Sequence, residues 1–381
     1  MKINKQIIFL LLLVVAWCSA YGQNIDIDKI KEASVYVENG REKHNNNDFH
    51  GAILDYDKAI ELNQPNPFAF KFRADAKFRI KDFSGAIEDY SKQITKEEDN
   101  PELYYNRGLC KYFLGDYKGA VNDLSGAIYL DQSDPFYFYF RASSRERLNE
   151  LEQALKDLES AIDLDPENID FYTFKAEIKE YLNDFDGAIK VWDIVINLSE
   201  DNSEAYLSRG KAKMENDDFS EALNDFSKVL EINPQNFDAI FNRGISKGKL
   251  EDYRGAIFDF SNAIELNPKN DDVYYRRALM KGQLKDHRGV IIDISKAIAI
   301  NPIYNYYNFL GTANWLLKED QKAIECYSKA IELNSKDANS YLYRALVKLT
   351  LKDVNGACLD LSKAGELGSG MAYLYIEEYC N

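Results

Sequence analysis

The sequence predicts an all-α fold, an α-solenoid of ten helix-turn-helix units that ends in a C-terminal capping helix. The first observation is a recurring pattern, seen in FSGAIEDYSKQI (83–94), YKGAVNDLSGAI (117–128) and YRGAIFDFSNAI (253–264). The second is its period, because the small residue after the aromatic recurs every 34 residues, with a single interval of 33. Such a period is typical of stacked two-helix units. The third is that all eight prolines lie at unit junctions, where proline begins a helix without breaking its interior.

The chain begins with the pattern of a secretory signal peptide, predicted over residues 1–22. Lys2 and Lys5 precede an apolar run that ends at Trp17, and small residues follow it. The run is shorter than the roughly 20 residues that span a bilayer. No later segment reaches that length. We therefore expect an exported protein, periplasmic or secreted, with no integral membrane segment after cleavage.

The processing of this segment has two open points. Cleavage after Ala20 and cleavage after Gly22 both fit the pattern, and a short lead at 23–32 follows. Cys18 raises the alternative of a lipid anchor, which the bulky Trp17 before it disfavours.

Ten repeats follow, and we number the positions of each from 1 to 34, with the aligned small residue at position 20. That residue is Ala in nine repeats and Val290 in the eighth. The repeats span residues 33–66, 67–100, 101–134, 135–168, 169–202, 203–236, 237–270, 271–303, 304–337 and 338–366. Residues 367–381 are predicted to form the capping helix, with Met371, Leu374 and Tyr375 facing the last repeat, because a solenoid end needs a cover. An exposed docking helix is the alternative.

Two further positions make the pattern specific. Position 8 is Gly or Ala in all ten repeats, and position 4 is aromatic in nine, with Ile240 as the exception. Small residues at positions 8 and 20 let two antiparallel helices approach closely. The pattern resembles the tetratricopeptide repeat (TPR), and the resemblance covers nearly all of the chain after residue 32. It implies a right-handed superhelix whose first helices line a concave groove.

Position 16, just before the second helix, is acidic in every repeat, as in Asp82, Asp116 and Glu150. An acidic side chain there can cap the helix or stabilise its positive end. These ten acids therefore need no ligand to explain them.

Three charged columns predict a structural ion-pair ladder through the repeats. Position 7 is basic in eight repeats, position 11 is basic in nine, and position 23 is Asp in eight. Positions 7 and 11 share a helix face, so their like charges need the Asp as a partner. The predicted ladder residues include Arg107, Lys111, Asp123, Arg209, Lys213, Asp225, Arg243, Lys247 and Asp259. We expect the ladder to fix register between repeats, since partly buried ion pairs are poor evidence for net stability.

Two repeats depart from the ladder. The ninth has Leu310, Asn314 and Cys326 in the three columns, and the fifth has Val191 in place of the Asp. A basic stripe for a polyanion is the alternative to the ladder, but the Asp column would cancel its charge.

The overall charge excludes two classes of partner. Acidic residues number 63 and basic residues 47, which gives a formal net charge of −16. Nucleic acids and anionic membrane surfaces both attract a basic face. We therefore expect neither as a partner.

Few residues could carry catalysis or hold a metal. His44 and His50 lack the spacing of a helical metal pair, and His287 replaces an aromatic residue at position 17. The sequence contains no glycine-rich phosphate loop and no nucleophile motif, so we expect no enzyme, no cofactor and no metal site. Cys358 and Cys380 could join the cap to the last repeat, but spacing alone cannot establish a disulfide. A further cysteine, at position 10 of repeat three, is expected to be a buried apolar filler.

The resemblance also indicates a binding surface, because in the TPR family positions 2, 5, 9, 12 and 13 face the groove. Transferred residue by residue, these positions are rich in aromatic side chains, above all in repeats two to four. The predicted partner-binding residues are Phe68, Phe78, Tyr105, Tyr112, Phe113, Phe136, Tyr139, Tyr181, Phe241, Tyr275 and Trp315. Such rings contribute strongly to interfaces when they are exposed; their burial by superhelical packing is the alternative. Repeats five and six present acids, which disfavour acidic partners: Asp170, Glu177, Glu180, Glu204 and Glu215.

The resemblance therefore implies a non-enzymatic exported scaffold that binds a segment of another protein in its groove, with cell-envelope assembly as a suggested role. The alternative is a module that binds a glycan or a cell-wall peptide on the aromatic surface of repeats two to four. One subset of the family clamps a peptide carboxylate with Lys at position 5 and Asn at position 9. No repeat here has that pair, so a cytosolic co-chaperone role is disfavoured. The oligomeric state stays open.

Overall fold

The computed structural model describes residues 27–62 and 68–380, and this part of the chain contains helices and turns but no strand. The predicted signal peptide, residues 1–22, lies outside the described residues. The chain divides into two compact units, Met1–Ile178 and Lys179–Asn381. We describe each unit by itself.

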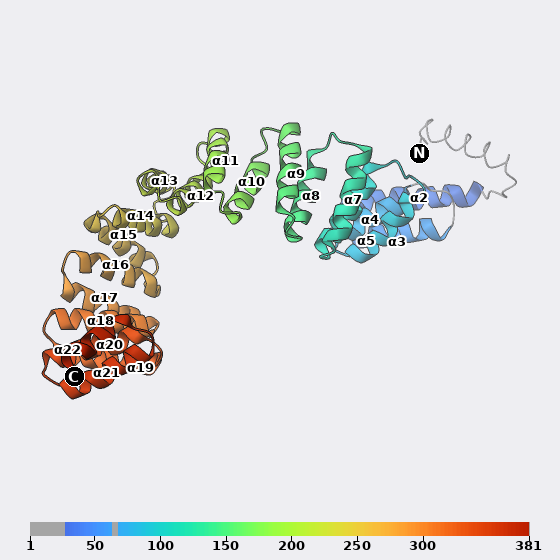
Figure 1. Ribbon diagram of the computed structural model, residues 1–381. Helices are drawn as coiled ribbons and strands as arrows, with labels where there is room; N and C mark the ends of the chain where they lie inside the picture. Colours follow the sequence, from blue (N-terminus) through green and yellow to red (C-terminus); the bar gives the residue numbers. More distant parts are fainter. Residues whose placement is uncertain (1–26, 63–67, 381) are drawn as a thin grey trace. The chain divides into compact units, whose positions relative to one another are not determined.

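The helices of the first unit follow one another in pairs, and the even-numbered helix of each pair is the first helix of its repeat (Figure 1). They are α2 (Ile27–Asn45), α3 (Phe49–Glu61), α4 (Ala69–Arg79), α5 (Phe83–Ile94), α6 (Pro101–Phe113), α7 (Tyr117–Leu130), α8 (Pro135–Arg147), α9 (Leu151–Leu164) and most of α10 (Ile169–Tyr181).

The second unit continues the same alternation and ends in a single helix. Its helices after α10 are α11 (Phe185–Leu198), α12 (Ser203–Glu215), α13 (Phe219–Ile232), α14 (Phe237–Lys249), α15 (Tyr253–Leu266), α16 (Asp271–Gln283), α17 (His287–Ile300), α18 (Tyr304–Leu316), α19 (Asp320–Leu333), α20 (Ala338–Thr350), α21 (Val354–Glu366) and α22 (Gly370–Tyr379). The predicted all-α fold of helix pairs with one terminal helix is thereby confirmed. None of the helices in the described residues is long and apolar enough to cross a membrane.

One turn conformation joins the two helices of every repeat. The residue at position 15 has a positive φ in all ten repeats, a glycine in one of them, Gly115, and a non-glycine residue such as Asn47 in the others. The acid at position 16 follows and caps the second helix in seven repeats, as predicted. Asp116, for example, accepts a hydrogen bond from the backbone N–H of Gly119 at 2.9 Å.

The glycine at position 19 explains which acids form this cap. A Cβ on Gly119 would lie 2.0 Å from a carboxylate oxygen of Asp116. The three repeats that lack the side-chain cap carry Gln153, Glu221 and Lys322 at position 19. The acid and the glycine three residues later therefore act as one turn signal.

The small residues at positions 8 and 20 form the contact between the two helices of a repeat. Position 20 is fully buried in every repeat, and so is position 8. At position 8 a glycine often faces a large ring, as Gly244 faces Phe260, whereas Ala278 lies in one core cluster with the smaller Ile294. A Cβ on Gly244 would lie 2.9 Å from Cε1 of Phe260.

We expect Gly244→Ala to destabilise the second unit by about 1–3 kcal/mol, because the added methyl overpacks the contact with Phe260. Adding Phe260→Leu should recover much of that loss by making room. Urea unfolding of the single and double variants measures both effects. The control is Gly282→Ala, whose Cβ would meet no atom closer than 3.8 Å; an equal loss in this control would contradict the explanation.

The first helices form the inner face of each unit. Consecutive first helices approach each other in the pairs α2 and α4, α6 and α8, α12 and α14, α14 and α16, and α18 and α20. Second helices of neighbouring repeats make no such close approach within the described part of either unit. The groove positions therefore lie on the more tightly curved side of each unit.

The terminal helix α22 covers the last repeat with a face different from the predicted one. Ala372 is buried and Ile376 packs against the last repeat together with Tyr375, whereas Met371 and Leu374 are 53% and 60% exposed. The prediction was therefore wrong for Met371 and Leu374. The reason is geometric, because positions 372, 376 and 380 are spaced by four residues and share one helix face.

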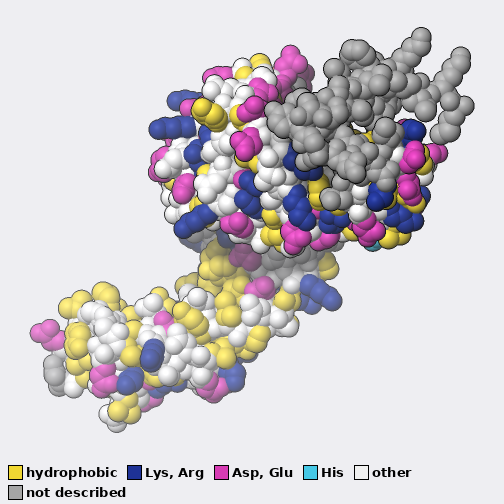
Figure 2. Space-filling view, turned by 90° about the vertical axis from the view of Figure 1, so that its right-hand side faces the viewer, with side chains coloured by type: hydrophobic (Ala, Val, Ile, Leu, Met, Phe, Trp, Pro, Cys, Tyr) yellow, Lys and Arg dark blue, Asp and Glu magenta, His cyan; other side chains and the backbone are white. Residues whose placement is uncertain are grey.

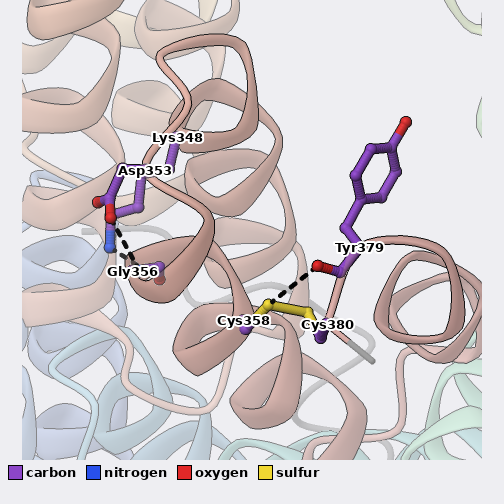
Figure 3. Close-up of a disulfide and its surroundings, with 6 residues drawn as sticks. All are labelled: Lys348, Asp353, Gly356, Cys358, Tyr379 and Cys380. Carbon is purple, nitrogen blue, oxygen red and sulfur yellow. Dashed lines mark hydrogen bonds between the residues drawn. A yellow bond between two sulfur atoms is a disulfide. The ribbon is translucent and has the colours of Figure 1, made fainter.

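A disulfide holds that face against the last repeat. Cys358 on α21 is bonded to Cys380 at the end of α22, with the two Cα atoms 5.7 Å apart (Figure 3). The sequence left this pairing open. With the cross-link at position 380, α22 is docked at its C-terminal end as well as through Ala372.

Candidate functional site

The predicted groove residues differ in exposure. Four are well exposed: Phe68 (48%), Phe113 (52%), Phe136 (43%) and Tyr181 (71%). The other seven are half-buried: Phe78, Tyr105, Tyr112, Tyr139, Phe241, Tyr275 and Trp315. Packing therefore covers part of the predicted surface, and the first unit keeps three exposed phenylalanine rings.

One ring cluster of the first unit surrounds Phe113. Its ring stacks on Phe83 with centroids 5.1 Å apart and contacts Phe78 at 6.0 Å and Tyr112 at 5.5 Å. Tyr112 in turn contacts Tyr117 at 5.6 Å. Phe113 is thus exposed on one side and held by neighbouring rings on the other.

A second ring cluster of the first unit joins repeats three to five. Tyr139 contacts Phe171 at 5.2 Å, and the exposed Phe136 contacts the same ring at 5.7 Å. Tyr105 contacts Tyr137 at 5.0 Å, and burial raises the pKa of Tyr137 to about 12. Phe171 itself is fully buried, so it anchors the exposed ring.

Charged groups of the first unit lie beside these rings. Lys71 Nζ lies 3.4 Å from Asp75 and 3.0 Å from Glu102, and Asp75 also accepts a hydrogen bond from the hydroxyl of Tyr90 at 2.6 Å. The predicted groove acids Asp170 and Glu177 are exposed. The only lysine at a groove position of repeats two to four is thus already paired with carboxylates.

In the second unit the remaining predicted groove residues are spread over several repeats. Glu180 accepts a hydrogen bond from the indole N–H of Trp192 at 2.6 Å, and burial raises its pKa. The acids Glu204 and Glu215 are exposed. Phe241 stacks on Phe237. These residues do not form one ring cluster comparable to those of the first unit.

The second unit also contains a groove pocket that the sequence reasoning missed. It has a volume of about 180 Å³ and is lined by Leu279, Gly282, His287, Phe309 and Leu316 among others. Position 12 is glycine in the seventh and eighth repeats, Gly248 and Gly282, and a large side chain in the other eight. A Cβ on Gly248 would lie 2.7 Å from Sδ of Met280, which fills that space, whereas a Cβ on Gly282 would meet no atom closer than 3.8 Å, so the space beside Gly282 stays open. A search for glycine in otherwise bulky groove columns could have found it.

The structure brings together the residues at positions 7, 11 and 23 of a repeat, which form one rung of the predicted ladder. In the seventh repeat Arg243 donates from Nε and Nη2 to the two carboxylate oxygens of Asp259 at 2.9 and 2.7 Å, and Lys247 Nζ lies 2.7 Å from Asp259. Asp259 is fully buried, whereas the two basic side chains are about one-fifth exposed. Among the described residues seven repeats have this complete rung, including Arg107 with Lys111 and Asp123, and Arg209 with Lys213 and Asp225.

Among the described residues, six of the seven arginines at position 7 of the complete rungs also reach the preceding repeat, through position 25, which the sequence reasoning missed. Arg107 Nη1 donates to the hydroxyl of Ser91 at 3.1 Å, and Arg209 Nη1 donates to Asp193 at 2.6 Å. Both partners stand at position 25, which is Ser, Asp or Glu in all ten repeats. A search for charged columns alone overlooks it because most of its members are serine.

The aromatic column at position 4 lies under the same arginines. The guanidinium of Arg107 is 5.7 Å from the ring centroid of Tyr104, and that of Arg209 is 5.4 Å from Tyr206. A cation over a ring gains about 0.5–2 kcal/mol. Position 4 therefore supports the ladder as well as filling space beside the small residues.

Three repeats lack the complete rung. The first has only the pair of Lys43 with Asp55, at 2.6 Å. In the fifth, Lys175 pairs with Glu159 and Lys179 pairs with Asp184. The ninth has no charged group in the three columns, as its sequence requires.

The cysteines and histidines form no cluster for metal binding within the described residues, where no group of three or more potential ligands occurs. Cys110 is fully buried, and burial raises its pKa to about 12. His44 packs against Phe49 with ring centroids 5.1 Å apart. On the face shown in Figure 2, basic and acidic side chains lie interspersed.

Comparison with known proteins adds a family match. The tetratricopeptide repeat family model matches residues 101–134, 137–168, 203–236 and 304–337. A search of curated protein sequences found no match.

Several solved structures are similar to the chain. A tetratricopeptide repeat protein from Parabacteroides merdae is 19% identical, with 65% of this chain and 99% of that chain covered and a TM-score of 0.48. The C-terminal part of a TPR repeat-containing protein from Cytophaga hutchinsonii is 18% identical over 71% of this chain and 97% of its own, with a TM-score of 0.48. YrrB, described as a TPR protein with an unusual peptide-binding site, is 22% identical, with 47% of this chain and 92% of that chain covered and a TM-score of 0.43. The family model therefore matches four of the ten predicted repeats, and over these segments the chain is similar to the tetratricopeptide repeat family.

Proposed function

We propose that the protein is a non-enzymatic scaffold that binds an extended segment of another protein along the inner face of its first unit. The observation that carries this proposal is the set of exposed rings Phe68, Phe113 and Phe136, which stand at groove positions of repeats two to four. A rigid array presents such contacts at fixed spacing, which lowers the entropy cost of binding.

The packing of these rings supports the proposal. Phe113 is backed by Phe83 and Phe78, and Phe136 is backed by the buried Phe171. A ring that is already held in place loses little conformational freedom when a partner covers it. An exposed ring held in this way suits an interface better than a freely rotating one.

Charges of both signs lie at groove positions of the first unit. Glu102, Asp170 and Glu177 are exposed there, and so are Arg79 and Arg147, while Lys71 is paired with Asp75 and Glu102. These side chains set no clear preference for an acidic or a basic segment. The formal net charge of −16 disfavours a polyanion, so we propose no nucleic-acid partner.

We also propose that the protein is exported and works in the cell envelope or outside the cell. The signal-peptide pattern of residues 1–22 supports this. So does the disulfide between Cys358 and Cys380, because disulfides persist in oxidising compartments and are rare in the cytosol.

The proposal is tested with a triple variant, Phe68→Ala, Phe113→Ala and Phe136→Ala, used with the intact protein to capture partners from native envelope extracts. We expect the variant to lose at least about 90% of the captured partner, because several ring contacts worth about 1 kcal/mol or more each are removed. The matched control is Tyr129→Ala, an 86% exposed aromatic residue outside the groove positions. Equal capture by the triple variant and the wild type would refute the groove.

A second candidate is the binding of a glycan or a cell-wall peptide on the same rings, since exposed aromatic faces also stack on sugars. Titration of the purified protein with envelope glycans and with the captured protein partner separates the two. Saturable glycan binding that the triple variant loses would favour this second function.

A further inference from the structure

The ninth repeat contains a surface pocket at the place where its ladder rung is missing. The pocket has a volume of about 430 Å³. Four of its lining residues stand in ladder columns: Ser295 at position 25 of the preceding repeat, Leu310 at position 7, Asn314 at position 11 and Cys326 at position 23. It lies entirely within the second unit and uses none of the groove positions.

The substitutions in the ninth repeat explain why the pocket is open. In seven other repeats an arginine at position 7 and a basic residue at position 11 extend to the Asp at position 23. In six of these repeats that arginine also reaches a serine or aspartate at position 25, as Arg277 reaches Ser261 at 3.0 Å. Leu310, Asn314 and Cys326 are all shorter than the residues that they replace. The volume of an arginine head and a lysine head is therefore left unfilled.

The pocket keeps acceptors that a guanidinium would satisfy. Asn314 is 5% exposed, and its Nδ2 donates to the carbonyl oxygen of Leu310 at 2.8 Å and contacts Cys326 Sγ at 3.8 Å. Its side-chain carbonyl oxygen has no hydrogen bond among the described residues. The hydroxyl of Ser295 and the carboxylate of Glu325 line the same pocket. These three side chains all offer acceptor oxygens, so a donor suits the pocket better than an apolar group does.

From this geometry we infer that the pocket binds an arginine side chain of a partner protein, which supplies the missing rung from outside. The guanidinium, with five N–H donors, would lie between Asn314, Ser295 and Glu325. Leu310 and Leu317 would cover its aliphatic stem, as apolar surfaces do for long basic side chains. The serine at position 25 is an acceptor that the internal rungs also use, whereas Glu325 supplies the negative charge that Asp supplies at position 23 of those rungs; the arginine comes from a second chain.

The charges at the rim modulate this binding. Lys322 and Glu319 form an ion pair with each other, so their charges offset. Glu325 attracts a guanidinium, whereas Arg288, which also lines the pocket, repels it. Replacing Arg288 with Ala should therefore strengthen the binding of an arginine peptide, and replacing Glu325 with Gln should weaken it.

The test uses the full chain and two capped peptides, acetyl-Gly-Arg-Gly-amide and acetyl-Gly-Leu-Gly-amide. The readout is alkylation of Cys326, which lines the pocket, in a chain that carries Cys18→Ser; Cys110 is buried, and Cys358 and Cys380 form a disulfide. Burial raises the pKa of Cys326 to about 11, so the reaction is followed at about pH 9, where a small thiolate fraction reacts. The arginine peptide should slow alkylation about twofold at a concentration equal to its Kd. The leucine peptide should have no effect.

A variant that restores the three ladder residues of the ninth repeat tests whether the pocket is the space left by the missing rung. The triple substitution Leu310→Arg, Asn314→Lys and Cys326→Asp rebuilds the rung found in seven other repeats. Nuclear magnetic resonance titration should show that this variant binds the arginine peptide at least about tenfold more weakly than the wild type does. Asn314→Leu is the second variant, and it should lose the arginine peptide without closing the pocket. Equal protection of Cys326 by both peptides would mean an apolar pocket and would overturn the inference. No protection by either peptide, or undiminished binding to the rebuilt rung, would overturn it as well.

Discussion

Asp259→Asn is expected to lower the free energy of unfolding of the second unit by about 3 kcal/mol. The substitution leaves Arg243 and Lys247 facing each other without a counter-charge, and uncompensated charges in partly buried sites cost about 3–5 kcal/mol. Both basic side chains keep about one-fifth of their exposure, which places the loss at the lower end. Urea unfolding gives the total effect, and hydrogen exchange of the α14 and α15 amides locates it.

A double-mutant cycle shows whether the pair itself is responsible. Arg243→Met alone should cost less than Asp259→Asn, because Lys247 still neutralises the carboxylate. The coupling between the two substitutions should be at least about 1 kcal/mol, and additive effects would refute the rung. Asp238→Asn on α14 is the control, since Asp238 is 58% exposed and its contact with Lys211 is 3.8 Å long; a change within about 0.5 kcal/mol is expected there.

A triple variant of the same rung tests whether the ladder adds net stability or instead fixes the register between repeats. Replacing all three charges together, with Arg243→Met, Lys247→Met and Asp259→Leu, should leave the unfolding free energy within about 1 kcal/mol of the wild type, because well-packed apolar groups can replace a buried ion pair. A large loss in this triple variant would instead mean that the ladder is a net source of stability.

Removing the disulfide with Cys358→Ser and Cys380→Ser is expected to cost about 3 kcal/mol in the docking of α22. The cross-link spans 22 residues, and closing a loop of that size removes about this much unfolded-state entropy. Ala372 is the sole fully buried residue of α22 within the described chain, so the apolar contacts that remain are few. Hydrogen exchange of the α22 amides should therefore become fast while the amides of α20 change little.

Reductant provides the matched control for this second result. Treating the wild type with dithiothreitol should reproduce the variant, because it opens the same bond, and should leave the double-serine variant unchanged. Slow exchange of α22 in the double-serine variant would contradict the expectation. It would mean that Tyr375, Ile376 and Ala372 hold the helix without the cross-link.

Much of the fold could be predicted from residue types and spacing. The two-helix period, the caps at position 16 and the partners of the ladder depend on residues within one repeat, at separations that recur along the chain. Asp123, for example, stands 16 residues after Arg107 and 12 after Lys111, and the same separations occur in every complete rung. Because the ten repeats can be aligned with one another, these recurring separations are visible in the single sequence.

The candidate site was less predictable, because exposure depends on neighbouring repeats. Phe113 and Tyr112 are adjacent groove residues, yet Phe113 is exposed and Tyr112 is half-buried. Phe171, which anchors Phe136 and Tyr139, stands at position 3 and belongs to no groove column. The position of a residue within the repeat determines which face its side chain points to, but the size of the neighbouring side chains decides how much of that side chain stays exposed.

Periodicity alone was enough to establish the helix pairs, their turns and the charged columns, because these follow from local propensity and from contacts inside one repeat. The folded arrangement decided which rings remain exposed, which face α22 turns inward, how position 25 links consecutive repeats and where the vacant rung of the ninth repeat opens. These features depend on how side chains of different helices share a limited volume. Gly282 at position 12 and Leu310 at position 7 look like minor departures in the aligned repeats, but in the packed molecule a pocket opens beside each of them.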